Sequence, residues 1–322
     1  MNEYLDLLDK KILFELDLDS RISIIQLAKR VNASKETVNF RIKRLIKNNY
    51  IKGFITTIYT SHLNRFYFKL FYKFHKTTPE VDKRIINFIQ NYKKTAWFGS
   101  FEGPYDLGFL ILAESIYDLD NFLIEFRNLF GQYILEQEIH IITSVHRFNL
   151  KFFYQGKKDL HTKYPKELKE SKIDNIDYEI IGTLANNSRI SVLELAKNLK
   201  VDSGTIIYRI KRLKDNKILG THTLAVNFEM FNQQHFQINF KLINQESIDK
   251  LINYFAIQKN ATFATVTLGK YDLAIELVVR DNKELKNILD QVKENFSEEI
   301  IDHNTFLITK EYNVTWFPHK LK

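Results

Sequence analysis

Residues 20–53, SRISIIQLAKRVNASKETVNFRIKRLIKNNYIKG, decide the fold of the first part of the chain. A second stretch, SRISVLELAKNLKVDSGTIIYRIKRLKDNKILG at residues 188–220, repeats it at an offset of 168 positions (188 − 20). Self-similarity over this length indicates a duplicated structural module. Each copy therefore predicts the same local structure.

The first copy predicts two short helices joined by a tight turn. Ser23 and Ser34 are placed to cap the two helices, because a serine oxygen accepts an amide hydrogen that the first turn leaves unpaired. Asn32 tolerates the left-handed backbone that a tight turn needs. Apolar residues follow one face of each helix: Ile24, Leu27, Ala28 and Val31 in the first, and Val38, Ile42 and Leu45 in the second.

The second helix carries lysines and arginines on its outer face and flanks. A basic helix of this kind fits the major groove, so the sequence predicts contact with double-stranded DNA. A basic helix that is merely solvated is the alternative, and two copies behind matching first helices favour DNA. We expect Lys35, Asn39 and Lys43 to face the groove. The arginines either neutralise phosphates or brace the domain internally. The candidate DNA-binding residues are Lys35, Asn39, Arg41, Lys43, Arg44 and Lys47 in the first copy, and Ser203, Arg209, Lys211 and Arg212 in the second.

The two second helices differ in the residues that would read bases. Asn39 can offer adenine paired hydrogen bonds, whereas its counterpart Ile207 can only touch a thymine methyl group. Gly204 replaces Glu36 and weakens the first turn by up to about 1 kcal/mol relative to alanine. The sequence therefore predicts that the first copy reads bases more strictly than the second.

Both copies resemble the winged helix-turn-helix of the Lrp/AsnC family of feast/famine regulators. The motif of the opening helix is LDKKIL at residues 8–13 and IDYEII at 176–181, and R-I-S-x-x-x-L-A and R-I-x-R-L follow in both copies. The resemblance covers nearly the whole chain outside a linker. It implies two units end to end, each with an ACT-like regulatory domain, and therefore sequence-specific DNA binding and transcriptional regulation.

The remaining periodicity predicts a βαββαβ order in each half, which is the ferredoxin-like order of an ACT-like domain. The aromatic and basic residues of 66–74 alternate as in a strand with one buried face. The predicted fold class is α+β, with two winged helix-turn-helix domains and two ferredoxin-like domains in tandem. The expected domains are 1–60, 61–154, 173–230 and 231–322, with a polar linker at 155–172.

Aromatic tails at 148–153 and 312–317 predict extra strands that pack across a domain interface, or a tail lying over its own domain. In the family, regulatory sheets pair to form dimers. The resemblance therefore implies either a pseudo-dimer within one chain, or a homodimer or higher oligomer of two or more chains through the ACT-like domains.

The loops between the central strands of each regulatory unit are candidate effector sites. The resemblance implies a small-molecule effector, amino-acid-like, bound beside them between regulatory domains. A hairpin turn explains the same residues, because glycine supplies positive φ and aspartate bonds its own backbone. The candidate residues are Gly103, Tyr105 and Asp106, and Gly269, Tyr271 and Asp272.

Composition and motifs argue against most enzymes and against a membrane protein. The net charge of +8 suits a polyanionic partner, and the start of the chain does not resemble a signal peptide, so we expect a cytoplasmic location. Without cysteine or histidine-rich metal spacing, we expect no cofactor, no metal and no catalytic residue. Two alternatives stay open: an architectural DNA-compacting protein, and a siroheme decarboxylase, a class that resembles paired Lrp/AsnC units.

Overall fold

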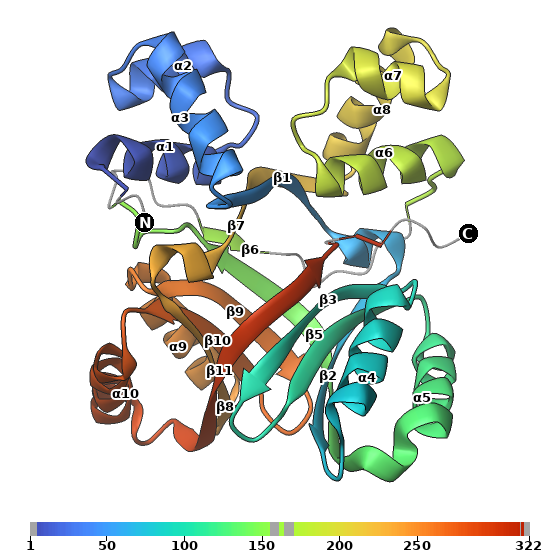
Figure 1. Ribbon diagram of the computed structural model, residues 1–322, viewed down its shortest axis with the longest axis vertical. Helices are drawn as coiled ribbons and strands as arrows, with labels where there is room; N and C mark the ends of the chain where they lie inside the picture. The colour runs from blue at the N-terminus through green and yellow to red at the C-terminus, as the bar shows by residue number, and fades with distance from the viewer. Residues whose placement is uncertain (1–4, 155–160, 164–170, 316, 319–322) are drawn as a thin grey trace.

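The computed structural model describes residues 5–154, 161–163, 171–315 and 317–318. Two helical units, the first head and the second head, lie side by side at one end of the molecule (Figure 1). Strands with outer helices fill the other end. The first head contains α1 (Leu7–Leu18), α2 (Ile24–Val31) and α3 (Lys35–Lys47), and the second contains α6 (Asn175–Asn186), α7 (Val192–Leu199) and α8 (Ser203–Asp215).

The helix-turn-helix prediction is confirmed in both heads. Ser23 and Ser34 cap α2 and α3 by accepting hydrogen bonds from the amides two positions into each helix, those of Gln26 and Thr37. Asn32 has φ 55° and ψ 55°, the left-handed geometry expected for the turn. In the second head Asp202 caps α8. We call α3 and α8, the second helices of the two helix-turn-helix motifs, the recognition helices.

The strand that follows each recognition helix does not form a wing hairpin. Instead β1 (Ile51–Ile58) pairs antiparallel with β7 (Leu219–Val226), its counterpart in the other half. Among the described residues neither strand pairs with a returning strand of its own half, and each runs on into a 3-10 turn, η1 (Thr60–Leu63) or η3 (Phe228–Phe231). The two heads are therefore joined through a shared two-stranded ribbon.

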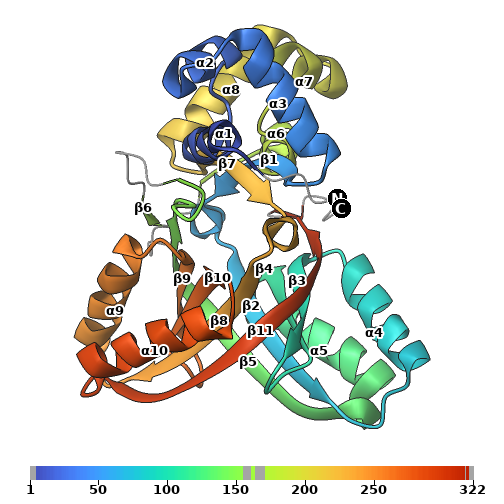
Figure 2. The same cartoon turned by 60° about the vertical axis from the view of Figure 1, so that its left-hand side comes forward.

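Each half then continues with the predicted βαββαβ order. Figure 2 shows the helices of both units on the outer faces of the strands. In the first half the elements are β2 (Phe66–Phe74), α4 (Pro79–Asn91), β3 (Thr95–Glu102), β4 (Leu107–Ala113), α5 (Ile116–Phe130), η2 (Gly131–Tyr133) and β5 (Ile134–Phe148). In the second they are β8 (Gln234–Leu242), α9 (Gln245–Ile257), β9 (Ala261–Leu268), β10 (Leu273–Val279), α10 (Asn282–Phe296) and β11 (Ile300–Val314).

The sheets of the two halves pair at both edges and close on themselves. Strand β11 pairs with β3 of the first half, and β5 pairs with β9 of the second half, all antiparallel. Because β2 also pairs with β5, the order β2-β4-β3-β11-β8-β10-β9-β5 returns to its start. We call this arrangement the closed sheet. The two halves form a pseudo-dimer within one chain, so no second chain is needed to cover these sheet edges.

Three contacts between repeat-equivalent residues mark a pseudo-two-fold axis through the molecule. The Oγ atoms of Ser20 and Ser188 lie 2.7 Å apart, Ile55 lies opposite Thr223 in the ribbon, and Lys69 Nζ donates to Gln237 Oε1 at 2.6 Å. The two residues of each pair are 168 positions apart, so they occupy equivalent positions of the repeat. Equivalent residues meet where a two-fold axis passes through an interface. The axis runs from the heads through the closed sheet.

Three expectations need correction. Strand β2 is buried on both faces at its centre, because its inner face meets the other half; Lys69 is only 4% exposed. The first tail is no strand beyond Phe148, and its Leu150 and Phe153 enter the core of the first head. The linker contains a three-residue strand, β6 (His161–Lys163), paired with β5. The rest of the linker at 155–160 and 164–170 lies outside the described residues.

The second tail agrees with the prediction of an extra strand across an interface. Strand β11 continues to Val314 and pairs with β3 of the first half, where Tyr312 stacks on Phe98 at 4.5 Å between ring centroids. Beyond it, Phe317 is buried in the core of the second head. Each tail thus ties a regulatory unit to the head of its own half.

Candidate nucleic-acid interface

The recognition helix of the first head presents a polar face to solvent. Its apolar residues Val38, Ile42 and Leu45 are buried against the head, which leaves the intervening positions outside. This exposure results from the helical period of 3.6 residues, which separates the two sets onto opposite faces. Four of the predicted DNA-binding residues are exposed: Lys35, Asn39, Lys43 and Lys47.

The predicted phosphate-binding arginines of the first head bind a carboxylate of their own domain. Asp9 of α1 is completely buried, and it accepts hydrogen bonds from Arg41 at 3.1 Å and Arg44 at 2.5 Å. Arg41 also reaches Asp6, at 2.6 Å. This is the internal brace that the sequence left as an alternative: the two arginines fix α3 against α1.

The second head repeats this brace at every position. Arg209 contacts Asp174 at 2.7 Å and Asp177 at 2.9 Å, and Arg212 also binds the fully buried Asp177. Lys211 remains exposed on the outer face of α8, and Ser203 is half-buried at its first turn. DNA binding by the predicted residues of both heads stays a prediction.

We expect Asp9→Asn to lower the free energy of unfolding by about 1–3 kcal/mol, the typical contribution of hydrogen bonds to a charged group. The loss stays moderate because Arg41 and Arg44 are 22% and 24% exposed and can bind water instead. Urea unfolding measures the change. Asp290→Asn on the exposed face of α10 is the control, and equal stabilities of the two variants would contradict a bracing role for Asp9.

Sequence reasoning did not name one exposed pair on the recognition helices. Phe40 and its repeat counterpart Tyr208 are both 64% exposed, although aromatic side chains usually lie inside. They lie on the same helical face as Lys43 and Lys211, where an aromatic ring can contact a thymine methyl group. The signal was available, since both copies keep an aromatic residue at a position outside the apolar period.

The predicted effector loops lie where the two halves meet. A Cβ atom added at Gly269 would lie 2.8 Å from His140 Nδ1 of β5, and one added at Gly103 would lie 2.9 Å from Phe306 Cβ of β11. Gly103 has φ +136°, so a side chain there is also strained. Each loop therefore packs against the last strand of the opposite half.

The aspartates of these loops are bound by their own domain. Asp106 accepts from the amide of Phe74 and from Lys73 Nζ, both at 2.7 Å. Asp272 accepts from the amide of Leu242 at 2.8 Å. These contacts reach the first strand of the same regulatory unit and not the backbone of the turn itself, and the associated Tyr105 and Tyr271 are buried. Effector binding by these residues stays a prediction.

A small polar cluster adjoins the second of these loops. Glu138 of β5 receives hydrogen bonds from His140 at 3.3 Å and from Lys270 at 2.7 Å. Although burial favours the neutral acid, these donors lower the pKa of Glu138 to about 2. The carboxylate is therefore ionised at neutral pH and links the two halves through Lys270. No group of three or more potential metal ligands occurs in the described part of the chain.

Two family descriptions match the two heads. The family described as winged helix-turn-helix DNA-binding matches residues 5–52, and the AsnC-type helix-turn-helix domain matches residues 173–214. These segments coincide with α1–α3 and with most of α6–α8. Both heads therefore match helix-turn-helix DNA-binding domains, the second of them of the AsnC type. Among the described residues, no helix has the length and apolar character needed to cross a membrane.

Each of the curated relatives matches somewhat more than a third of this chain. An uncharacterised HTH-type transcriptional regulator of Pyrococcus furiosus is 28% identical over 121 residues, which are 38% of this chain and 82% of the relative. The HTH-type transcriptional regulator FL11 of the same organism is 29% identical over 126 residues, 37% of this chain and 80% of the relative. This coverage agrees with two regulator-sized units in one chain.

A solved structure with two such halves in one chain resembles the whole arrangement. The siroheme decarboxylase NirDL superimposes with a TM-score of 0.64 over 97% of this chain and 94% of that protein, at 12% sequence identity. At this identity the likeness concerns the fold alone. The relatives thus favour a regulator, while the fold of the two halves together also occurs in an enzyme.

Proposed function

We propose that this chain is a sequence-specific transcriptional regulator that acts in the cytoplasm and binds one DNA duplex with both heads. The observation that carries the proposal is the pseudo-two-fold relation of α3 and α8 at one end of the molecule (Figure 1). Two helix-turn-helix heads with this symmetry contact half-sites about one helical turn, or about 34 Å, apart, or multiples of it.

The exposed residues support different tasks for the two heads. Asn39 and Lys43 of the first head offer hydrogen bonds to base edges, whereas Ile207 of the second offers only apolar contact. The braced arginines have little freedom for phosphates, so exposed lysines supply most of the electrostatic attraction. We propose that the first head reads one half-site strictly and that the second reads a more permissive one.

Selection of bound duplexes from a randomised pool tests this function. At low and moderate salt, sequencing of the bound fraction is expected to return a motif with two unequal half-sites. Affinity is expected to fall with a log–log slope of roughly −0.9 for each phosphate contacted. Salt-dependent binding without an enriched motif favours the architectural DNA-compacting alternative. A palindrome with equally sensitive halves contradicts the unequal heads.

The proposal includes control of the regulator by a small-molecule effector, and it assigns the chain no enzymatic activity. The support is the set of regulator relatives and the position of the two loops between the halves, where an amino-acid-like effector would contact both. Calorimetric titration with a panel of amino acids tests the effector, and no saturable heat from any of them contradicts it.

The whole-chain likeness to NirDL makes a siroheme decarboxylase the second candidate. Absorbance titration with an iron tetrapyrrole distinguishes it from the regulator. Tight stoichiometric binding together with carbon dioxide release establishes the enzyme. If the absorbance spectrum does not change and an enriched DNA motif is found, the result favours the regulator over the enzyme.

A further inference from the structure

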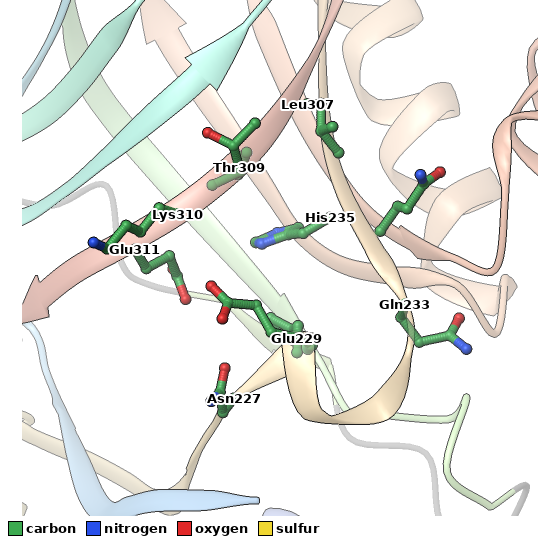
Figure 3. A pocket seen from close by; sticks show the side chains of 11 residues that line it. Asn227, Glu229, Gln233, His235, Leu307, Thr309, Lys310 and Glu311 are labelled. Atoms are coloured by element: carbon green, nitrogen blue, oxygen red, sulfur yellow. The ribbon is translucent and has the colours of Figure 1, made fainter. Parts of the chain in front are cut away.

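A groove of about 230 Å³ opens where the second head joins the closed sheet. Its walls come from η3, from the start of β8 and from the outer part of β11, which Figure 3 shows from close by. It lies away from the predicted effector loops, which contribute no residue to its lining. Its lining includes Phe228, Glu229, His235, Lys310 and Glu311.

The groove carries an excess of negative charge. The carboxylates of Glu229 and Glu311 point toward one another across it (Figure 3). Within the described residues, the Glu229 carboxylate has no hydrogen bond or ion pair, whereas Glu311 accepts from Trp97 Nε1 at 2.8 Å and lies 3.5 Å from Lys52 Nζ. The ammonium of Lys310 points away (Figure 3) and lies 4.7 Å from the ring centroid of Tyr312.

A nearly buried imidazole points into the same space. His235 is 7% exposed, and its ring lies between η3 and β11 in Figure 3. Its Nε2 lies 3.3 Å from Glu276 Oε2, and a neutral ring with its proton on Nε2 can accept a hydrogen bond at Nδ1. The part of the chain that the structure describes provides no hydrogen bond to Nδ1, which is left as an acceptor. Phe228 packs on the ring at 4.8 Å between centroids and adds an apolar wall.

We propose that this groove binds a small primary ammonium compound. An ammonium group has three N–H donors and no acceptor, and the groove offers acceptors from Glu229, Glu311 and His235. A buried cation needs paired and hydrogen-bonded surroundings, which two carboxylates supply. The ring of Phe228 faces the short alkyl chain of such a ligand. Metal ions and quaternary ammonium ions lack N–H donors and are the cations against which this site discriminates.

The first half does not repeat the acids of this groove at the equivalent positions. The position equivalent to Glu229 is Ser61 (229 − 168), and that equivalent to His235 is Tyr67 (235 − 168). In the last strand the offset is 166, so Val145 stands where Glu311 does (311 − 166). The first half therefore cannot form a second ammonium site of this kind.

Ligand binding at this groove would act on the first head. Glu311 is shared with Lys52 of β1, the strand that leaves the first recognition helix. An ammonium ligand competes with Lys52 for this carboxylate and weakens the link between the first head and β11. This regulatory step rests on the proposed DNA-binding function, whereas the binding of the ligand does not.

Isothermal titration calorimetry of the full chain with n-butylammonium chloride tests the site. We expect saturable binding of one equivalent with a Kd at or below about 1 mM, and at least a tenfold weaker Kd for Glu229→Gln. Glu298→Gln removes an exposed charge outside the groove and is expected to bind like the parent chain. Tetramethylammonium chloride at equal ionic strength controls for cations without N–H donors.

The outcomes separate the site from the regulation. Absence of saturable heat, equal binding of tetramethylammonium, or unchanged binding by Glu229→Gln overturns the ammonium site. If the ligand binds as expected, DNA affinity is measured with and without it. Unchanged DNA affinity then overturns the coupling to the first head, and a failure to bind DNA at all overturns the proposed function while leaving the ammonium site in place.

Discussion

Replacement of Glu276 by glutamine is expected to lower the free energy of unfolding by about 3–5 kcal/mol, because it leaves a buried lysine without its counter-charge. Lys69 Nζ lies 3.6 Å from Glu276 Oε1 inside the closed sheet. The two residues come from different halves, so this ion pair is part of the contact that holds the pseudo-dimer together. Glutamine keeps the size of the side chain and removes only the charge.

The surroundings of Lys69 offer little else to hold a charge. Its ammonium donates to Gln237 at 2.6 Å and lies 5.5 Å from the ring centroids of both Phe71 and Trp97. Burial lowers the pKa of Lys69, against the opposing charge of Glu276. Burial disfavours the Glu276 carboxylate too, yet its hydrogen bond with His235 and the charge of Lys69 keep its pKa below 4.5. This stabilisation is present above pH 4.5 and is lost as pH falls through the lower, folded-state pKa.

Chemical unfolding of two further variants completes the test. The double change Lys69→Met with Glu276→Leu is expected to restore stability, since well-packed apolar residues often replace a buried ion pair without loss. The protein already places a leucine, Leu110, opposite Lys69 in the neighbouring strand. Asp290→Asn breaks the exposed pair with Lys286 and should change stability by less than about 1 kcal/mol. A small loss in Glu276→Gln would show that Lys69 is hydrated or neutral.

The same residues explain why the halves are not interchangeable. Lys69 lies on the pseudo-two-fold axis and faces its counterpart Gln237. A symmetric pair of first halves would place two lysines in contact in this buried position, where like charges repel strongly. The polar residues at this position therefore favour pairing of a first half with a second half. One chain contains one half of each kind.

The heads were predictable from sequence because their signals are local. Serine caps, an apolar period of 3.6 residues and the left-handed Asn32 each act within a few positions. The duplication made the prediction stronger, since both copies carry a capping side chain before each helix and the same apolar period. The βαββαβ order was predictable for the same reason, because each strand or helix has its own spacing of apolar residues in the sequence.

The closure of the sheet was not predictable in this way. Pairing of β11 with β3 joins residues about two hundred positions apart, and no local pattern specifies it. Lys69 shows the consequence: the alternation in β2 suggested one buried face, but the opposite half covers the other. Likewise the sequence could not decide between phosphate and Asp9 as the partner of Arg41, because the choice depends on the packing of α1 on α3.

We expect Lys43→Glu to weaken binding of a two-half-site duplex by about 10²- to 10⁴-fold. Lys43 is exposed on α3 and outside the bracing network, so the head keeps its fold while its groove-facing surface becomes repulsive. Linked heads that bind one duplex gain affinity through effective concentration, and loss of one head removes this gain. Fluorescence anisotropy with the selected duplex measures the change, and the salt slope should also become shallower.

Lys211→Glu and Lys83→Glu decide whether both heads contribute. Lys211 is the repeat counterpart of Lys43 on α8, and Lys83 is exposed on α4, away from the heads. If both heads bind at once, the first of these changes weakens binding strongly and the second does not. If Lys211→Glu binds like the parent chain, only the first head contacts DNA. The second head would then serve to hold the ribbon of β1 and β7, and a single half-site should bind as tightly as two.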